Sequence, residues 1–222
     1  MKRAEFRAYQ ETTISRFEQI LSQGKGYDQG LPSYTDPNPF MRWLIWKRVD
    51  VVLTAIASQV PMKNALDFGC GYGVFIPYLI ANTDNTIAYD LMIDELKALG
   101  EETGWQRIAY ESDFSKIASM KQSFDLILAI EVLEHIDELD EAIRMFYKTL
   151  NDDGNLLVSG PTENFLYQFG RKLVGYTGDY HVRNIYDIRA MLAKQFHVQK
   201  IATIIPGLPF FEVYRCTKGP NT

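Results

Sequence analysis

The chain has 222 residues, of which 46% are apolar and 13% aromatic, a composition that supports one folded domain and excludes an intrinsically disordered protein. Its 23 basic and 28 acidic side chains give a net charge of −5, which argues against a general nucleic-acid binder held by phosphate neutralisation. Because the two cysteines form no disulfide framework, no secretory signal is recognisable and no apolar run reaches the ~18 residues of a membrane span, we expect a soluble, cytoplasmic protein.

Residues 1–60 carry two helical patterns. Apolar side chains recur at helical spacing over 3–22 and again over 40–58, and a stretch rich in glycine and proline separates the two. We expect these residues to form a helical lid over a second unit, residues 61–222.

Beyond residue 60, short apolar runs alternate with amphipathic stretches, which indicates strands alternating with helices. The expected strands are 65–68, 86–89, 107–110, 124–130, 155–159, 196–205 and 210–217. The expected helices are 73–80, 93–103, 139–150 and 185–194. This alternation predicts an α/β fold with a parallel sheet covered by helices on both faces. The tight connection 206–209 predicts that the last two strands form an antiparallel hairpin.

A glycine loop stands where the first of these strands ends, with the sequence LDFGCGYG over residues 66–73. Glycine lets the backbone adopt positive φ and approach a ligand closely. The dinucleotide fingerprint would require Gly or Ala at position 74, where this chain has Val74. Asp67 precedes the glycines, and a carboxylate at this turn suits a cationic amine better than a pyrophosphate.

Acidic residues also follow the next two strands. Asp90 ends the second strand, where a carboxylate can accept hydrogen bonds from both hydroxyls of a ribose. Asp113 follows the third strand and can bind an adenine amine, while the neighbouring Phe114 covers the ring. Three acids without a phosphate-binding lysine describe an adenosine joined to an amino-acid-like group, which is S-adenosylmethionine.

The stretch 64–160 resembles the class I S-adenosylmethionine-dependent methyltransferases. Five motifs carry the resemblance in the family's order: 66–73, 89–90, 112–114, 124–136 and 150–158. The resemblance implies a Rossmann-like, seven-stranded sheet in the order 3-2-1-4-5-7-6 with strand 7 antiparallel. It also implies cofactor-binding roles for Asp67 at the methionine ammonium, Gly69 and Gly71 against the cofactor, Asp90 at the ribose, Asp113 and Phe114 at the adenine, and Ile130 and Glu131 along the cofactor toward the acceptor.

Four residues are candidates for proton transfer or metal binding. If the segment after the fourth strand is helical, Glu131, Glu134 and His135 share a face, and His181 can join them around a divalent cation. This set resembles the one in small-RNA 2′-O-methyltransferases and, less closely, the one in ubiquinone-type O-methyltransferases. The same string also occurs in metal-free relatives, so we predict no metal and assign His135 and His181 as candidate general bases.

The expected activity is methyl transfer to a small-molecule acceptor. Aromatic side chains are expected to wall the acceptor pocket between the lid and residues 161–185: Trp43, Trp46, Phe165, Tyr167, Tyr176 and Tyr180. Residues 61–160 hold 7 basic and 18 acidic side chains, whereas basic residues exceed acidic ones in both flanks. This distribution favours an anionic acceptor or one presented on an anionic membrane surface. A sugar and a lipid-linked intermediate are the other small-molecule acceptors we consider. The basic residues expected at the pocket mouth are Arg42, Lys47, Arg48, Arg171, Lys172, Arg183 and Arg189.

Two alternative functions and several partner questions stay open. One alternative is a 2′-O-methyltransferase acting on RNA ends, and the other, of a different class, is a non-catalytic subunit that binds S-adenosylmethionine. We expect no DNA partner, since there is no recognition domain. Contact with a membrane surface, without a span, is compatible with the sequence, and the oligomeric state is not indicated.

Overall fold

The computed structural model describes residues 3–26, 31–162, 183–205 and 211–219. Several residues named from the sequence lie outside these ranges, as does the connection 206–209. They are Phe165, Tyr167, Arg171, Lys172, Tyr176, Tyr180 and His181.

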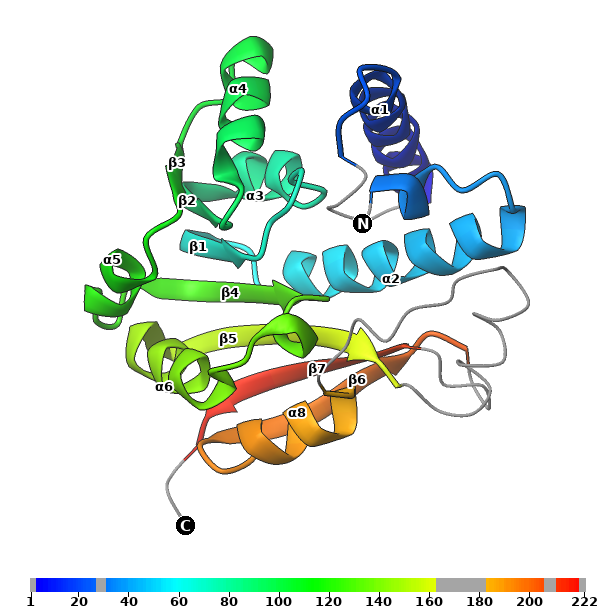
Figure 1. The fold of residues 1–222 in the computed structure, drawn as a ribbon. Helices are drawn as coiled ribbons and strands as arrows, with labels where there is room; N and C mark the ends of the chain where they lie inside the picture. Colours follow the sequence, from blue (N-terminus) through cyan, green and yellow to red (C-terminus); the bar gives the residue numbers. More distant parts are fainter. Residues whose placement is uncertain (1–2, 27–30, 163–182, 206–210, 220–222) are drawn as a thin grey trace.

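A seven-stranded sheet in the order β3-β2-β1-β4-β5-β7-β6 runs through the molecule (Figure 1). Its strands are β1 (Met62–Phe68), β2 (Thr83–Tyr89), β3 (Ile108–Glu111), β4 (Phe124–Ile130), β5 (Leu150–Pro161), β6 (Phe196–Thr203) and β7 (Phe211–Lys218). Strand β7 pairs antiparallel with both β5 and β6, and all other pairs are parallel. The strand order and the antiparallel last pair expected from the sequence are confirmed.

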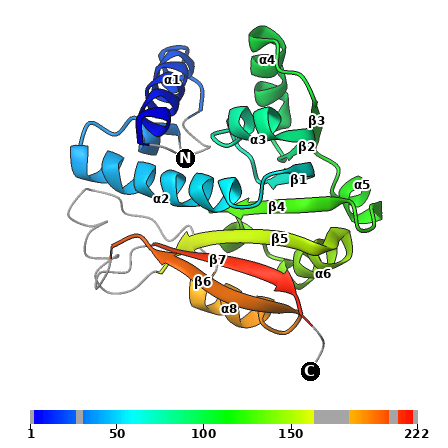
Figure 2. The same ribbon diagram turned by 180° about the vertical axis from the view of Figure 1, so that it is seen from behind.

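Helices cover both faces of this sheet, as the views in Figures 1 and 2 show. They are α1 (Arg3–Ser22), η1 (Leu31–Tyr34), α2 (Pro39–Ala57), α3 (Ile76–Asn82), α4 (Ile93–Thr103), α5 (Phe114–Ser119), η2 (Leu133–His135), α6 (Leu139–Thr149) and α8 (Ile185–Leu192). Helices α1 to α4 share one apolar cluster, and α5, α6 and α8 share the other. Successive residues of β4 alternate between the two clusters, Leu126 and Leu128 in the first and Ile127 and Ala129 in the second, because side chains of a strand point to opposite faces in turn.

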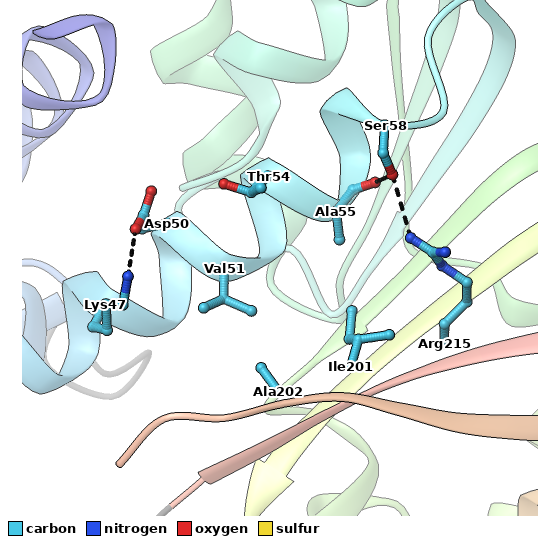
Figure 3. A pocket seen from close by; sticks show the side chains of 9 residues that line it. All are labelled: Lys47, Asp50, Val51, Thr54, Ala55, Ser58, Ile201, Ala202 and Arg215. Atoms are coloured by element: carbon cyan, nitrogen blue, oxygen red, sulfur yellow. Dashed lines mark hydrogen bonds and ion pairs between the residues drawn. The ribbon is translucent and has the colours of Figure 1, made fainter. Parts of the chain in front are cut away.

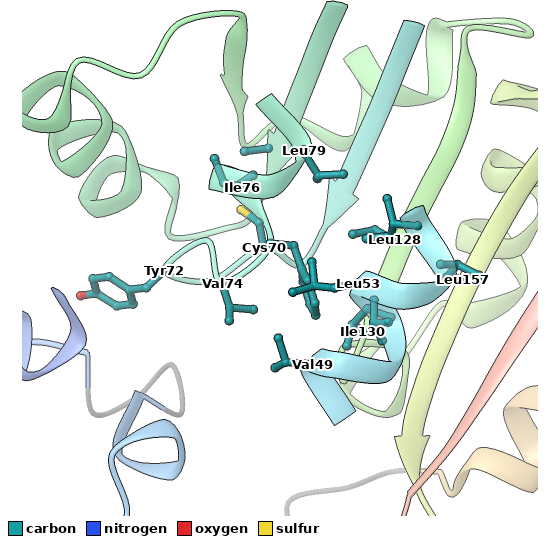
Figure 4. Close-up of a cluster of buried hydrophobic side chains, with 14 of the residues drawn as sticks. Val49, Leu53, Cys70, Tyr72, Val74, Ile76, Leu79, Leu128, Ile130 and Leu157 are labelled. Atoms are coloured by element: carbon teal, nitrogen blue, oxygen red, sulfur yellow. The ribbon is translucent and has the colours of Figure 1, made fainter. Parts of the chain in front are cut away.

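Helix α2 packs directly on the sheet. Its start is fixed by Asn38, whose side-chain oxygen accepts hydrogen bonds from the backbone N–H groups of Phe40 and Met41 at 2.9 and 3.3 Å. Val49 and Leu53 are fully buried against the glycine loop and β4 (Figure 4). The second of the two N-terminal helices therefore shares a core with the strands, and its action as a lid stays a prediction.

Three local differences from the expected elements have physical reasons. The helix expected from residue 73 begins at Ile76, because Gly73 has φ of +71°, outside the helical region. Helix α5 was not expected, since six residues are too short to display a helical period. Strands β1, β2 and β5 begin earlier than expected. Their first residues are largely polar and show no strand pattern in the sequence, because pairing with the neighbouring strands determines where these strands begin. Among the described residues, no helix is long and apolar enough to cross a bilayer.

Candidate active site

The glycine loop follows β1 and contacts the end of β2 and the segment after β4, at the carboxyl ends of these strands. The backbone N–H groups of Gly69 and Cys70 donate to the carbonyl of Tyr89 at the end of β2, at 2.8 and 3.1 Å. Gly69 has φ of +76°, and a Cβ at this position would lie 2.3 Å from the Val132 side chain, just beyond β4. Glycine is thus required here for both backbone conformation and close packing.

Asp67, at the end of β1, is a buried carboxylate for which the described part of the chain provides no ion pair. It is 2% exposed, and its Oδ2 has no hydrogen-bond partner among the described residues. Burial, with a smaller contribution from the charge of Asp90, raises the pKa of Asp67 to about 7. A cationic group bound beside this carboxylate would favour its charged form, so the site fits an ammonium group.

Asp90 links the glycine loop to the turn after β2. Its Oδ2 accepts from the backbone N–H of Gly71 at 2.9 Å, and its Oδ1 accepts from that of Met92 at 2.9 Å. Each carboxylate oxygen can accept a further hydrogen bond, which suits the paired hydroxyls of a ribose. Leu91 and Met92 follow Asp90 directly and are 80% and 52% exposed, an apolar surface that the sequence reasoning did not single out.

Asp113 and Phe114 follow β3, which pairs with β2 in the sheet. Asp113 caps α5, since its Oδ1 accepts from the backbone N–H and the hydroxyl of Ser115 at 2.8 and 2.6 Å. These hydrogen bonds lower the pKa of Asp113. The Phe114 ring lies 6.3 Å from that of Phe68 and 6.4 Å from that of Tyr89, so it extends an aromatic cluster from the core to the strand end.

Glu131 is held by a partly buried ion pair that sequence reasoning missed. Its Oε2 lies 3.0 Å from Nη1 of Arg48, which is only 5% exposed, and its Oε1 accepts from the Ser159 hydroxyl at 2.8 Å. Glu131 has φ of +54°, an uncommon conformation for a residue other than glycine. Its neighbour Ile130 is buried at the end of β4. The sequence reasoning had placed Arg48 at the pocket mouth. Its position on the apolar side of α2 was the available signal that it is buried and needs an acidic partner.

Of the candidate general base and metal residues, Glu131, Glu134 and His135 lie in the described part of the chain, and His181 lies outside it. The segment after β4 forms the short 3-10 turn η2 and not an α-helix, so Glu131, Glu134 and His135 share no helical face. Glu134 is buried, whereas His135 is exposed. Within the ranges the structure describes, no group of three or more His, Cys, Asp or Glu side chains is placed to hold a metal ion.

The described basic residues expected at the pocket mouth all have protein partners. Besides Arg48, these contacts join Arg42 to the Asp36 carbonyl, Lys47 to Asp50, Arg183 to the carbonyls of Ile136 and Asp137, and Arg189 to the Tyr214 ring. Of the two tryptophans, Trp46 is buried and Trp43 is half-exposed, stacked on Phe40. Of these five cations, Lys47 and Arg48 are paired with a carboxylate, and the other three contact backbone carbonyls or a ring.

A groove of about 400 Å³ lies between α2 and strands β6 and β7 (Figure 3). The side chains that line it are Lys47, Asp50, Val51, Thr54, Ala55, Ser58, Ile201, Ala202 and Arg215. None of them belongs to the glycine loop or to the strand ends described above, so this groove is separate from the site that the acidic residues form.

The methyltransferase-domain family matches residues 40–209 of this chain, and the chain belongs to that family. The resemblance to class I S-adenosylmethionine-dependent methyltransferases is thereby confirmed. S-adenosylmethionine is the methyl donor expected of such a protein.

Curated relatives and solved structures agree with this assignment. The chain is 25% identical over 107 residues to the ubiquinone biosynthesis O-methyltransferase of Rickettsia conorii, covering 47% of this chain and 37% of that protein. It is 26% identical over 133 residues to the mitochondrial ubiquinone biosynthesis O-methyltransferase of Bos taurus, covering 54% of this chain and 34% of that protein. The chain spans between about a third and a half of the length of the curated relatives it matches.

Two solved structures show the same fold. The N-methyltransferase NodS of Bradyrhizobium japonicum, in complex with S-adenosylhomocysteine, aligns with a TM-score of 0.61 at 20% identity, over 94% of this chain and 99% of that chain. Magnesium protoporphyrin IX methyltransferase of Synechocystis, also with S-adenosylhomocysteine bound, aligns with a TM-score of 0.63 at 18% identity, over 87% of this chain and 94% of that chain.

Proposed function

We propose that this protein transfers a methyl group from S-adenosylmethionine to a small-molecule acceptor. The observation that carries the proposal is the buried Asp67 carboxylate, which has an unpartnered oxygen beside a glycine loop in a methyltransferase fold. A donor that ends in an ammonium group would supply the missing positive charge.

The residues at the strand ends divide the recognition of the donor among them. Asp67 binds the ammonium, the backbone at Gly69 and Gly71 lies against the donor, and Asp90 accepts from the ribose hydroxyls. Asp113 and Phe114 receive the adenine, and the segment at Ile130 and Glu131 leads toward the acceptor. When bound, S-adenosylmethionine supplies a methyl group activated by its sulfonium. The protein then has to position the two reactants and exclude water.

The small-molecule acceptor is supported by similarity to a ubiquinone biosynthesis O-methyltransferase and to a magnesium protoporphyrin IX methyltransferase. Sugars and lipid-linked molecules are the acceptors we favour, because the described basic residues expected at the pocket mouth already make contacts within the protein. We place the acceptor between the N-terminal helices, acting as a lid over residues 61–222, and the segment 161–185. Both cysteines are free and buried, in keeping with a reducing, cytoplasmic location.

For a hydroxyl acceptor, a base must remove a proton, and we assign this role to His135 and His181. His135 is exposed, so it is accessible to an acceptor. The RNA-end alternative would require both histidines to join a metal site with Glu131, which is already paired with Arg48. No observation favours that alternative over a small molecule.

The proposal is tested by incubating the protein with methyl-labelled S-adenosylmethionine and a cell extract, followed by separation of small molecules, lipids, RNA and protein. We expect label in the small-molecule or lipid fraction. Label in RNA or protein would overturn the assignment of the acceptor. Binding of the donor without any transfer would favour the non-catalytic subunit.

A further inference from the structure

The groove of Figure 3 uses a face of α2 that the candidate donor site does not use. Val49 and Leu53 of this helix are buried against the glycine loop and β4, whereas Val51 and Ala55 line the groove. With 3.6 residues per turn, these two pairs lie on opposite sides of the helix. A ligand in the groove would therefore not occupy the proposed donor site.

Apolar side chains form the middle of the groove, and polar groups stand at its two ends (Figure 3). At one end, Lys47 and Asp50 form an ion pair at 2.8 Å, and at the other end lie Arg215 and Ser58. At 1.5 Å per residue, the stretch of α2 from Asp50 to Ser58 is ~12 Å long. The apolar residues that line the groove along this stretch are Val51, Ala55, Ile201 and Ala202.

Arg215 is the cation of the groove that has no acidic partner in the described part of the chain. It takes part in none of the ion pairs there, and its hydrogen bond from Nη2 to the Ser58 hydroxyl is long, at 3.3 Å. Its Nε is buried and out of reach of a ligand, whereas Nη1 is neither buried nor hydrogen-bonded among the described residues. The outer edge of the guanidinium is thus the part that a ligand can contact.

The end of α2 does not neutralise this charge. The carbonyl of Ala55 accepts hydrogen bonds from the Ser58 hydroxyl at 2.7 Å and from Nε2 of Gln59 at 3.2 Å. Ser58 therefore links Arg215 to the helix end, whose carbonyls carry only roughly half an elementary charge. Since Lys47 is paired with Asp50, the groove has one cation without a carboxylate, next to an apolar strip.

We propose that this groove binds a monocarboxylate with an apolar tail, with the carboxylate on Arg215 and the tail along the apolar strip. A guanidinium presents paired N–H donors that match the two oxygens of a carboxylate. A single negative charge on the ligand balances the single unpaired cation. The inference goes beyond the proposed function, because this ligand is held away from the residues assigned to the methyl donor and is not assigned as the acceptor.

Calorimetry with octanoate, in the absence of S-adenosylmethionine, tests this assignment. Acetate has the charge without the tail and octanol has the tail without the charge, so octanoate should bind more tightly than either. In Arg215→Gln, the dissociation constant of octanoate should rise about tenfold or more, as for the loss of charge-assisted hydrogen bonds. Arg215→Lys keeps the charge without the paired donors and should recover part of the affinity.

Two further variants test the tail and the effect of net charge. Ala202→Leu places a larger side chain in the groove and should weaken octanoate binding without removing a charge. Arg144→Gln is the matched control, because Arg144 is exposed on α6, which packs on the other face of the sheet. Circular dichroism and thermal unfolding check that each variant is folded. If Arg215→Gln does not fold, Arg215→Lys and Ala202→Leu replace it.

The outcomes decide the inference separately from the proposed function. Absence of saturable octanoate binding in the wild type would overturn it, and so would wild-type affinity in Arg215→Gln or in Ala202→Leu. Tighter binding of octyl phosphate than of octanoate would show that the groove prefers a dianion, and would overturn the assignment of a monocarboxylate. None of these measurements depends on methyl transfer, so either proposal can fail without the other.

Discussion

Asp67 is the residue at which binding and stability oppose each other. The folded protein holds its pKa near 7, above the ordinary 3.8, mainly through burial. Because the folded state binds this proton more tightly than the unfolded state, folding stability falls as the pH rises from about 4 to about 7. Above pH 7 the whole penalty is present, and a bound cation would relieve it.

We therefore expect Asp67→Asn to be more stable than the wild type at pH 8, because the amide removes the buried charge. Each pKa unit corresponds to about 1.4 kcal/mol, so the gain is a few kcal/mol at most and disappears near pH 4. The measurement is urea unfolding at both pH values, with the exposed Asp84→Asn as control. The same variant should bind S-adenosylhomocysteine more weakly. Equal destabilisation at both pH values would contradict the origin assigned to the raised pKa.

Asp90 should affect affinity without a comparable effect on folding. Asp90→Ala removes a carboxylate that also holds the backbone at Gly71 and Met92, so we expect the dissociation constant of S-adenosylhomocysteine to rise about tenfold or more. Asp90→Asn keeps one acceptor oxygen, so its dissociation constant for S-adenosylhomocysteine should lie between those of the wild type and Asp90→Ala. Calorimetry provides the values, and Asp94→Asn on the first turn of α4 serves as control. Unchanged affinity in Asp90→Ala would remove Asp90 from the donor site.

At the scale of elements, the ion pair between Arg48 and Glu131 connects α2 to the end of β4. Arg48 also lies over the Phe211 ring at 5.0 Å, so one guanidinium from α2 contacts both the residue after β4 and β7. Burial lowers the pKa of Arg48 and Glu131 raises it, and the net direction is upward. The pair keeps the strained turn after β4 in place.

A double-mutant cycle measures the coupling in this ion pair. Arg48→Met leaves the Glu131 carboxylate without its cation, and we expect it to lower the free energy of unfolding by about 3 kcal/mol. Adding Glu131→Gln should recover part of that loss, since no unpaired charge then remains. Chemical denaturation gives the energies, and the exposed pair of Arg7 and Glu11 is the comparison, with an effect below about 1 kcal/mol. If the effects of the two single substitutions on the free energy of unfolding simply add in the double variant, the ion pair between Arg48 and Glu131 does not stabilise the fold.

Elements were predictable where a local pattern and the tertiary structure agree. The apolar run of β4 and the Gly104 end of α4 are examples, because burial on two faces and a left-handed C-cap leave direct sequence signals. The segment after β4 was not predictable as a turn, because φ of +54° at Glu131 depends on its contacts with Arg48 and Ser159. The positions of Asp67 at the end of β1 and Asp90 directly after β2 were predictable, whereas the partners of Arg48 and Arg16 are set by packing between distant segments.

At the scale of the whole molecule, the fold joins residues that are far apart in sequence and separates some that are adjacent. Arg16 reaches Gly73, and Arg183 donates to the carbonyls of Ile136 and Asp137. The neighbours Glu134 and His135, by contrast, are buried and exposed respectively. Glu134 and His135, which are adjacent in sequence, therefore do not form one cluster of metal ligands in the folded protein.

This separation leads to the prediction that methyl transfer is independent of a divalent metal. Glu131 is occupied by Arg48 and Ser159, so binding a cation there would first require the loss of a buried ion pair. We expect turnover, once an acceptor is found, and S-adenosylhomocysteine affinity to be unchanged after treatment with EDTA. His135→Ala should lower kcat for a hydroxyl acceptor and leave donor affinity intact, because a base is needed whether or not a metal is present. Loss of turnover on chelation, with recovery on Mg²⁺ or Mn²⁺, would contradict this prediction and favour the RNA-end methyltransferase, because the histidines would then act as ligands.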